Sequence, residues 1–585
     1  MPLIGRKDAW GLAAIGAGIA AANPYLAGNP SALLGLLPPI AGGAWLGWKQ
    51  ARDWLNVTDT QSREGFILPS DPCFPECMPQ GTGLRIGYTT DQQLPVDISD
   101  DALMRHTALV GQSGVGKTVL GEFLLWQQTV RGGGWIFIDA KLDSETCNRL
   151  AFMMHLLGRS DDFYVLNVDR PENSNTYNPI LRGDADEVAS RLLNLLPTSE
   201  NNPGADYYRQ SANHALTVIT GALKAARRRY HFSDLAILLQ SARALGELER
   251  IVPPGSPERM SVQVFLDQFR RRGKEGTQLD VNRLKEVLGG MSGRIATFAQ
   301  GKFGATFNCY TPEIDLTDIV TNNRCCYVML PTMGKEQAAL NLGKMVLSDL
   351  RSAVYNVQAL PKNRRPNPPF LVFADEMGSY VMGPGIARLF EQARSANVAL
   401  LPAFQSFANL SVVSPDFCDL IVQNTWQKAF FKFSSKDSPT DAAEIIGKTK
   451  RFAYSLSLSE QERASADNLR ATPKSTEQSG DGVSESYRES EEYRVTPDQL
   501  KALPVGECFV MSGARTFHVR TPMIRWPTPI PDYVVTHHPV QMPNDEFGLD
   551  FEGRYREFLL AAEDEGRALA QREGTGSRTD ENGSA

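Results

Sequence analysis

Residues 108–118 read "ALVGQSGVGKT", and this stretch decides the fold of the chain. An apolar run leads into a glycine-rich loop that matches G-x-x-x-x-G-K-[ST] from Gly111 to Thr118, and the following "VLGEFLLWQQ" reads as a helix. A strand, such a loop and a helix in this order predict a phosphate-binding site. Backbone N–H groups of the loop converge on phosphate oxygens, and the positive end of the helix adds to the attraction.

The whole loop is expected to contact a bound nucleotide. Its residues are Gly111, Gln112, Ser113, Gly114, Val115, Gly116, Lys117 and Thr118. We expect the Lys117 ammonium group to reach the β- and γ-phosphates and the Thr118 hydroxyl group to bind Mg²⁺.

A second motif, "FLVFADE" at residues 370–376, completes the expected site. An Asp at the carboxyl end of a buried strand can hold Mg²⁺ through water, and a neighbouring Glu can polarise the attacking water. We therefore predict Asp375 as a metal ligand and Glu376 as a catalytic residue. The alternative is an acidic pair that only caps the next helix.

The pattern around these motifs predicts an α/β fold with a mostly parallel sheet. Strands such as "GWIFIDAK" and "DFYVLNV" alternate with helical segments, and strands return after a long region of helical periodicity. We expect a nucleotide-binding domain in two parts, at 56–182 and 306–527, with a mostly helical inserted domain at 183–305. Residues 456–492 are polar and predict an exposed loop, and 528–585 predict an acidic, partly disordered tail.

The N-terminus predicts a membrane anchor. No charged residue occurs from Ala9 to Trp48, and "NPYLAGNP" divides this stretch into two apolar arms, each just long enough to cross a bilayer. Basic residues flank both outer ends, which favours a transmembrane hairpin at residues 1–55 with both ends in the cytoplasm. A cleaved signal peptide and a buried helical hairpin are the alternatives.

Composition sets wider limits. The chain has 585 residues, a formal net charge of -7 and eight Cys, so two to four domains are expected and a histone-like binder is disfavoured. The scattered Cys are typical of a reduced, cytosolic environment. Cys73 and Cys77 form half of a possible metal site, but no second ligand pair with suitable spacing lies nearby.

Four further features have a weaker signal. Arg394 follows Asp375 closely in sequence, although a lone Arg at this spacing is usually a surface charge. Gln405 ends the strand "VALLPAFQ", where a polar side chain can sense the γ-phosphate. The basic clusters "KAARRRY" and "QFRRRGK" suit phosphate contacts with DNA, although most such clusters are solvated faces.

Taken together, the ordered motifs resemble the coupling proteins of type IV secretion and conjugation systems, which are TraG/TraD-like ATPases within the FtsK/HerA group. The resemblance covers roughly residues 1–527 and rests on the hairpin, "HTALVGQSGVGKT", "IFIDAK", "YNPI", the helical insertion, "FLVFADE", "QARSANVALLPAFQS", "IVQNTWQKAFFK" and "TPDQLKALPVGECFV". The outer loop is shorter than in many relatives, and the insertion and tail match poorly in detail.

This resemblance implies a RecA-like ATPase that uses ATP and Mg²⁺ in a homo-hexameric ring. It places Arg394 as an arginine finger that serves a neighbouring subunit, and Gln405 as a sensor. It also implies a multi-pass protein of the bacterial inner membrane whose partners are DNA, relaxase and relaxosome proteins, and the secretion channel.

Three other functions stay open at this point. The chain could be an FtsK/HerA-like DNA translocase unconnected with secretion, or an ATPase that energises assembly of the secretion channel. It could also be a scaffold that binds nucleotide without turnover, although the Asp375-Glu376 pair argues against that role.

Overall fold

The computed structural model describes residues 67–68, 79, 81–196, 203–273, 276–332, 334, 336–380, 386–412, 414–460, 481–551, 553–554 and 556. They divide into a small unit, which includes Lys432–Val505 and Ala514–Thr516, and a main unit that holds most of the remainder. The predicted hairpin at 1–55, Cys73 and Cys77 lie outside the described residues. Within the described ranges, no helix is both long and apolar enough to cross a membrane.

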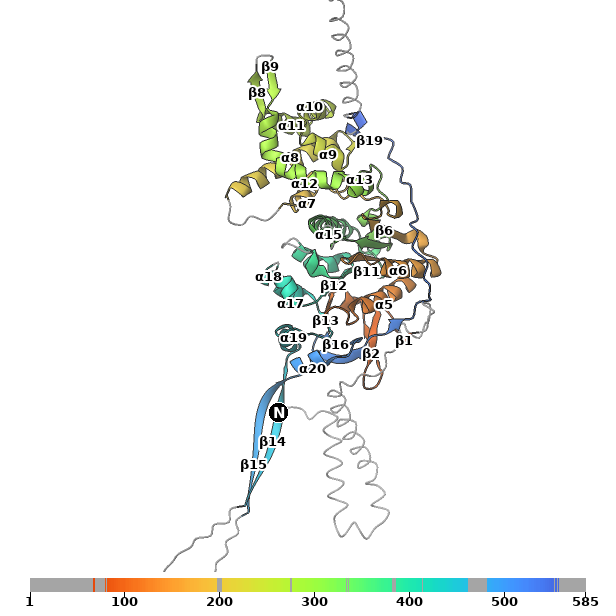
Figure 1. The fold of residues 1–585 in the computed structure, drawn as a ribbon, viewed down its shortest axis with the longest axis vertical. Coiled ribbons are helices and arrows are strands. Elements are labelled where there is room, and N and C mark those ends of the chain that lie inside the picture. Colours follow the sequence, from red (N-terminus) through yellow and green to blue (C-terminus); the bar gives the residue numbers. More distant parts are fainter. Residues whose placement is uncertain are drawn as a thin grey trace, which may run out of the picture. The chain divides into compact units, whose positions relative to one another are not determined.

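An eleven-stranded sheet forms the centre of the main unit (Figure 1). Its strand order is β3-β2-β17-β16-β13-β4-β12-β11-β5-β10-β6. The strands are β2 (Leu84–Thr89), β3 (Pro95–Ile98), β4 (Thr107–Val110), β5 (Trp135–Asp139), β6 (Phe163–Asn167), β10 (Cys325–Met329), β11 (Phe370–Ala374), β12 (Val398–Phe404), β13 (Gln427–Phe430), β16 (Glu507–Ser512) and β17 (Arg515–Arg520).

From β13 to β6 every neighbouring pair is parallel, which confirms the predicted mostly parallel α/β sheet. The pairs β13–β16, β17–β2 and β2–β3 are antiparallel. The parallel strands are buried along their whole length because helices cover both faces of the sheet. Helices α5 (Lys117–Val130) and α6 (Ser144–Leu156) pack on one face, and α15 (Glu336–Gln358) lies on the other.

Strand order decides where functional groups can meet. β4 lies beside β12, β12 beside β11, and β11 beside β5, all in parallel. The carboxyl ends of these four strands therefore form one continuous edge, although they come from distant parts of the sequence. Shorter helices complete the unit: α4 (Asp100–Leu103), α14 (Leu316–Thr321), α16 (Ala387–Gln392), α17 (Phe407–Ser411) and α18 (Pro415–Asn424).

Helices dominate the region between β6 and β10. They are α7 (Ala185–Leu193), α8 (Pro203–Ala225), α9 (Phe232–Leu238), α10 (Ala242–Ile251), α11 (Pro257–Asp267), α12 (Val281–Ala299) and α13 (Gly301–Phe307). A short antiparallel hairpin of β8 (Arg270–Gly273) and β9 (Gly276–Leu279) lies between α11 and α12. We call residues 183–305 the inserted region.

Residues 526–551 form an extended segment that we call the C-terminal strap. It has almost no regular structure, but Tyr533 and Val535 are buried against the core. Its short strand β19 (Phe547–Gly548) pairs in parallel with β7 (Arg228–Arg229) of the inserted region (Figure 1). Residues 528–551 of the predicted acidic, partly disordered tail (528–585) are therefore packed on the protein, and partial disorder of that tail stays a prediction. Side chains of the core bind the strap's backbone, an interaction that leaves no periodic signal in the sequence.

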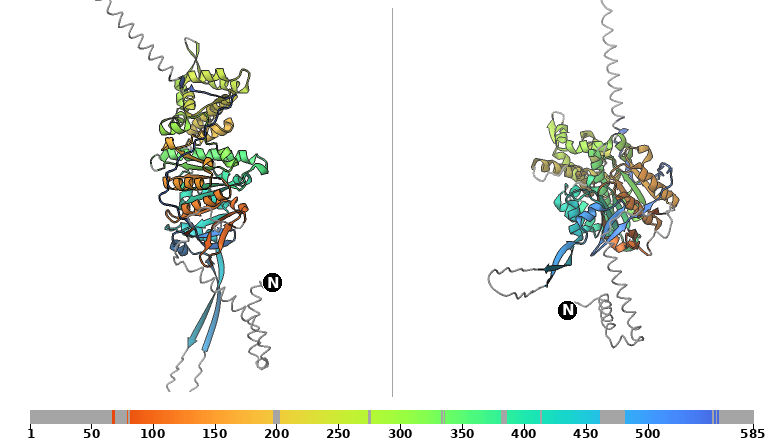
Figure 2. Two further views of the ribbon diagram at one scale, coloured as in Figure 1. Left: turned by 90° about the vertical axis from the view of Figure 1, so that its right-hand side faces the viewer. Right: turned by 60° about the horizontal axis from the view of Figure 1, so that its bottom comes forward.

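The small unit corrects the expectation of an exposed loop at 456–492. Residues 448–460 and 481–493 are not a loop but strands β14 (Lys448–Glu460) and β15 (Asp481–Tyr493), which pair as a long antiparallel ribbon (Figure 2). The polar composition of 456–492 suggested a loop, whereas the alternation of Ser and Leu in "SLSLSE" has the two-residue period of a strand. The small unit also contains helices α19 (Ser438–Ile446) and α20 (Pro497–Ala502).

Close packing of α5 on the sheet yields a stability prediction. A Cβ atom at Gly121 would lie 2.5 Å from Cζ of Phe373 on β11. Gly121→Ala should therefore lower the free energy of unfolding by about 1–3 kcal/mol, as overpacked cores do. The matched control is Gly289→Ala on α12, where nothing lies within 4 Å of the added Cβ. This change should stabilise by about 0.5–1 kcal/mol. Urea denaturation of both variants tests the difference, and equal stabilities would contradict it.

Candidate nucleotide site

The phosphate loop lies where β4 ends and α5 begins. Gly114 and Gly116 have φ angles of 77° and 109°, in the left-handed region that glycine adopts most easily. Gly116 is also the residue that caps the N-terminus of α5. Successive backbone N–H groups can therefore turn toward one point at the positive end of the helix, which is the geometry of an anion site.

Lys117 is buried in this loop, with its side chain folded back toward the loop backbone. Its Nζ donates to the carbonyl oxygens of Gly111, at 2.6 Å, and Gln112, at 2.8 Å. Burial lowers the pKa of Lys117, although the carboxylates of Glu376 and Asp375 oppose that shift. The two carboxylates favour the charged form of Lys117. Its ammonium group lies beside the loop and is therefore placed to bind the negatively charged phosphates of a nucleotide.

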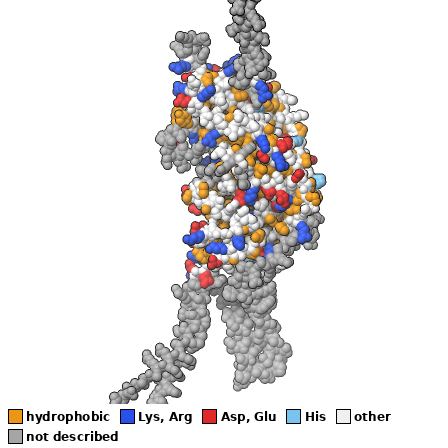
Figure 3. Space-filling model, in the orientation of Figure 1, with side chains coloured by type: hydrophobic (Ala, Val, Ile, Leu, Met, Phe, Trp, Pro, Cys, Tyr) orange, Lys and Arg blue, Asp and Glu red, His pale blue; other side chains and the backbone are white. Residues whose placement is uncertain are grey.

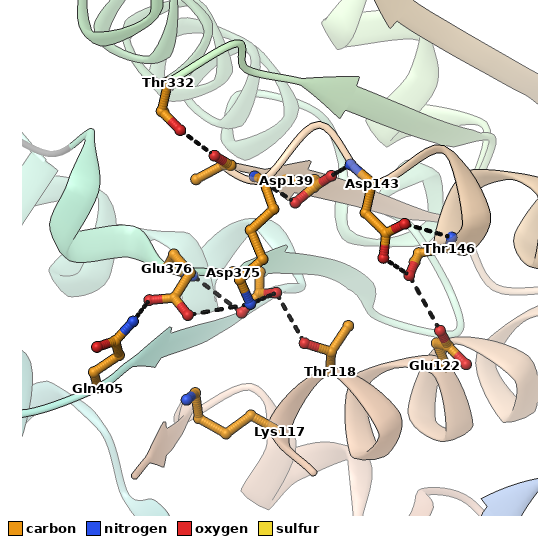
Figure 4. A network of polar contacts seen from close by, with 12 residues as sticks. Lys117, Thr118, Glu122, Asp139, Asp143, Thr146, Thr332, Asp375, Glu376 and Gln405 are labelled. Atoms are coloured by element: carbon orange, nitrogen blue, oxygen red, sulfur yellow. Dashed lines mark hydrogen bonds and ion pairs between the residues drawn. The ribbon is translucent and has the colours of Figure 1, made fainter. Parts of the chain in front are cut away.

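Asp375 and Glu376 stand at the carboxyl end of β11, and both are buried. Thr118 Oγ1 donates to Asp375 Oδ2 at 3.0 Å, so the phosphate loop and the acidic strand end are in direct contact (Figure 4). Glu376 has φ 50°, a left-handed conformation that is uncommon for a residue with a side chain. Gln405, at the end of β12, donates from Nε2 to Glu376 Oε2 at 3.0 Å.

Lys141, which was not among the expected site residues, lies between the two acids. Its Nζ lies 3.4 Å from Asp375 Oδ2 and 3.1 Å from Glu376 Oε1. Burial alone would lower the pKa of Lys141, but the two carboxylates hold it above its usual value. A signal was present, because "IFIDAK" ends a buried strand with charged residues. The parallel pairing of β5 with β11, which brings the two strand ends together, is not visible in the sequence.

Asp139 fixes the turn that carries Lys141. Its carboxylate accepts hydrogen bonds from the backbone N–H groups of Lys141, at 2.8 Å, and Asp143, at 2.7 Å. The Tyr327 hydroxyl group donates to it at 3.1 Å. Burial raises the pKa of Asp139, while these hydrogen bonds stabilise its charged form. We conclude that Asp139 orients the turn after β5.

Arg394 lies far from this group. It belongs to a 3-10 turn, Ala393–Ala396, that precedes β12, whereas Gln405 follows the same strand. β12 extends from Val398 to Phe404, between the two positions. At about 3.3 Å per residue, the two residues are on the order of 20 Å apart. Arg394 lies before the amino end of the strand, and Gln405 follows its carboxyl end. The Arg394 side chain is 52% exposed and pairs with Asp101 at 3.2 Å. It is therefore accessible from outside the main unit.

His106 supports the segment that carries Arg394. Its Nε2 lies 2.8 Å from the carbonyl oxygen of Phe390, and its Nδ1 lies 3.1 Å from the backbone nitrogen of Leu400. A neutral ring satisfies both contacts, because Nε2–H donates to the carbonyl and Nδ1 accepts from the Leu400 N–H. Protonation of Nδ1 would place two donors face to face.

The assembled groups can hold a divalent cation as well as phosphate. The Thr118 hydroxyl and the Asp375 carboxylate supply the oxygen ligands that Mg²⁺ prefers, and they already lie in contact. Among the described residues there is no separate cluster of three or more His, Cys, Asp or Glu that suits a metal. A phosphate loop beside a strand-terminal acidic pair on a parallel sheet is the site of a P-loop nucleotide-binding protein.

Comparison with known proteins agrees with this class. Residues 369–505 match the TraG-D_C family, described as the TraM recognition site of TraD and TraG. The type 4 coupling protein DotL of Legionella pneumophila is 24% identical over 402 residues, which are 61% of this chain and 50% of DotL. The chain thus spans half the length of that curated relative. The chain is thus similar to type IV coupling proteins.

Solved structures support the same fold. The bacterial conjugative coupling protein TrwBdeltaN70 in an unbound form has a TM-score of 0.50 and 15% identity, over 81% of this chain and 96% of that one. The plasmid coupling protein TrwB in complex with ADP and Mg²⁺ has the same TM-score and identity, over 81% and 97%. This likeness shows a RecA-like core.

Protonation of His106 yields a prediction for stability. Burial lowers its pKa from 6.5 to about 4, and the nearby Arg394 charge acts in the same direction. The unfolded chain therefore takes up this proton first, so stability should fall as pH drops from 6.5 toward 4, by about 3 kcal/mol in total. His106→Asn cannot become charged and, like His, tolerates the left-handed backbone at this position.

The measurement is urea denaturation of both proteins across this pH range. The variant should lose less stability than the unmodified chain as the pH falls. Parallel pH profiles would show that His106 does not carry the effect.

Proposed function

We propose that this chain is an ATPase that couples DNA and relaxase to a type IV secretion channel, in the manner of the proteins it resembles. The contact between Thr118 and Asp375 carries the proposal, because it joins the phosphate loop to the acidic strand end at one point. The ADP and Mg²⁺ bound by TrwB, a protein of similar fold, support ATP and Mg²⁺ for this site.

The roles of the side chains follow from their positions. Lys117 and the loop N–H groups would bind the phosphates, while Thr118 and Asp375 would hold Mg²⁺. The metal ion supplies charge neutralisation at the β- and γ-phosphate oxygens. Glu376 would polarise the attacking water, and Gln405 keeps that carboxylate in place through its hydrogen bond. Lys141 balances the charge of the two acids.

Arg394 would act on a second copy of the chain. Its place at the opposite edge of the sheet separates it from its own phosphate loop, and its exposure leaves it accessible to a neighbour. We therefore propose a homo-hexameric ring in which each Arg394 completes the site of the adjacent subunit.

Partners are proposed on different grounds. The match of 369–505 to a TraM recognition site supports docking of relaxosome proteins. The basic cluster at 224–230 gives less support for DNA contact than its sequence suggested: Arg227 pairs with Asp545 and Arg229 with Glu546, both in the strap. On the face shown in Figure 3, acidic and basic side chains are interspersed.

The first functional prediction concerns Glu376. Glu376→Gln should abolish most ATP hydrolysis but preserve ATP binding, because the change keeps the shape of the side chain and removes the charge that polarises water. Phosphate release and binding of a fluorescent ATP analogue measure the two properties. Glu391→Gln, at an exposed position of α16, is the matched control and should hydrolyse ATP normally. Hydrolysis by Glu376→Gln at the unmodified rate would refute the assignment.

A second prediction tests the shared site. Arg394→Ala should lower turnover by a factor on the order of 10³, the lower range for arginine fingers, and leave ATP affinity nearly unchanged. Mixed with a Lys117→Ala chain, which is inactive for a different reason, it should regain part of the activity. Some interfaces then pair an intact loop with an intact Arg394.

The control for that experiment is Arg388→Ala, an exposed Arg on α16 that should stay active. Mixed rings with no recovered activity would show that Arg394 does not act across an interface.

We also propose that residues 1–55 anchor the protein in the bacterial inner membrane as a hairpin. Their two uncharged arms with basic flanks support this proposal. Deletion of 1–55 should give a protein that needs no detergent and still binds ATP, because the phosphate loop lies outside the deleted segment. Partition of the full chain into the aqueous phase without detergent would contradict the anchor.

A further inference from the structure

The C-terminal strap is attached to the core mainly through its backbone. Asn148 accepts from Tyr533 N at 2.9 Å, and Asn173 donates to the Tyr533 carbonyl oxygen at 3.0 Å and accepts from Val535 N at 3.1 Å. Asn175 donates to the Thr536 carbonyl oxygen at 2.9 Å. Side-chain amides thus replace the neighbouring strand that an extended segment normally pairs with.

Two further contacts make this attachment firm. The Tyr533 hydroxyl group accepts from Asn167 at 2.8 Å, just where β6 ends. Glu313 accepts from His538 N at 2.7 Å and from Thr176 N at 2.9 Å. The strap is therefore held from Tyr533 to His538 by polar groups that are themselves fixed in the core.

The far end of the strap is attached to the inserted region. Phe547 N donates to the Arg227 carbonyl oxygen at 3.2 Å, and Leu549 N donates to that of Arg229 at 2.8 Å. The Arg227–Asp545 and Arg229–Glu546 ion pairs flank these bonds. Phe551 N donates to the buried carboxylate of Asp234 at 2.9 Å. The basic cluster at 224–230 therefore anchors the strap.

Between the two attachments the strap is mostly exposed. Residues 539–545 are exposed except for Met542, and Pro539 and Pro543 limit the backbone freedom of this stretch. The inserted region is also joined to the core by the two chain segments that enter α7 and leave α13, and by ion pairs such as Arg191–Asp349 and Lys302–Asp169. The strap adds a further attachment, at β7 and α9.

Polar contacts link the start of the strap to the nucleotide site. Trp526 Nε1 donates to Glu122 Oε2 at 3.1 Å, and Glu122 lies one helical turn after Thr118 on α5. Glu122 also accepts from Arg149 of α6 at 3.1 Å. The same helix, α6, is capped by Asp143, whose N–H donates to Asp139 at 2.7 Å (Figure 4). One part of the strap is therefore fastened to α5, which carries Thr118, and to α6, which follows the turn that carries Lys141.

We propose that the C-terminal strap is a mechanical link that transmits changes at the nucleotide site to the inserted region. The link rests on the proposed ATPase function, since nucleotide binding is the event it transmits. Movement of α5 or of the turn after β5 is carried by Glu122, Trp526 and Asn148 into the strap. Its nearly extended path then carries the movement to β7 and α9.

The experiment cuts the strap within the folded, full-length chain. A specific protease site is inserted between Pro543 and Asn544, in the exposed stretch between the two attachments. Hydrogen–deuterium exchange is measured without nucleotide, with Mg²⁺ and ADP, and with Mg²⁺ and a non-hydrolysable ATP analogue. Each condition is measured before and after cleavage. The matched control carries the same site between Gln93 and Leu94, an exposed turn that is not connected to the inserted region.

Before cleavage, nucleotide should change exchange in the phosphate loop, the strap and α9. After cleavage of the strap, the change in the phosphate loop should persist and the change in α9 should be lost. Cleavage at the control site should leave both changes intact. An undiminished response of α9 after strap cleavage, or no response of α9 before it, would overturn the link. Separate titration of nucleotide binding distinguishes this failure from that of the ATPase function: absent binding would overturn both.

Discussion

Buried charge at the carboxyl ends of four adjacent strands is the constraint on which the rest of this structure depends. Lys117, Asp139, Asp375 and Glu376 are all largely withdrawn from solvent. Isolated charges cannot be buried at an acceptable cost in free energy, so each must have an opposite charge or a set of hydrogen bonds. The parallel order β4-β12-β11-β5 meets this requirement, because each strand end brings a group that satisfies its neighbour.

Sequence reasoning found the parts of this site that local pattern encodes. The loop from Gly111 to Thr118 and the pair Asp375-Glu376 each follow a buried strand, and a strand followed by a fixed motif is visible without knowledge of the fold. Gln405 was found for a similar reason, because it ends the strand "VALLPAFQ". The structure adds that Gln405 contacts Glu376 rather than standing alone.

The features that were missed depend on pairing between distant segments. Lys141 reaches the two acids only because β5 lies beside β11. The sequence of the strap shows no helical or strand periodicity. Side-chain amides of Asn148, Asn173 and Asn175 bind its backbone, so these contacts hardly depend on which residue types the strap carries. The basic cluster at 224–230 looked like a surface for phosphate, but its partners, Asp545 and Glu546, lie more than 300 positions away.

The long separation between the two halves of the site has a consequence for synthesis of the protein. Thr118 and Asp375, which share a hydrogen bond, are 257 positions apart. At 5–20 residues per second, a ribosome needs about 13–50 s to pass from one to the other. During that time the phosphate loop, and then the helices of the inserted region, are made without β11 and β12, which lie inside the parallel part of the sheet. Nucleotide therefore cannot stabilise the early chain through the complete site, and the partly built sheet exposes the edge of β5 that β11 later covers.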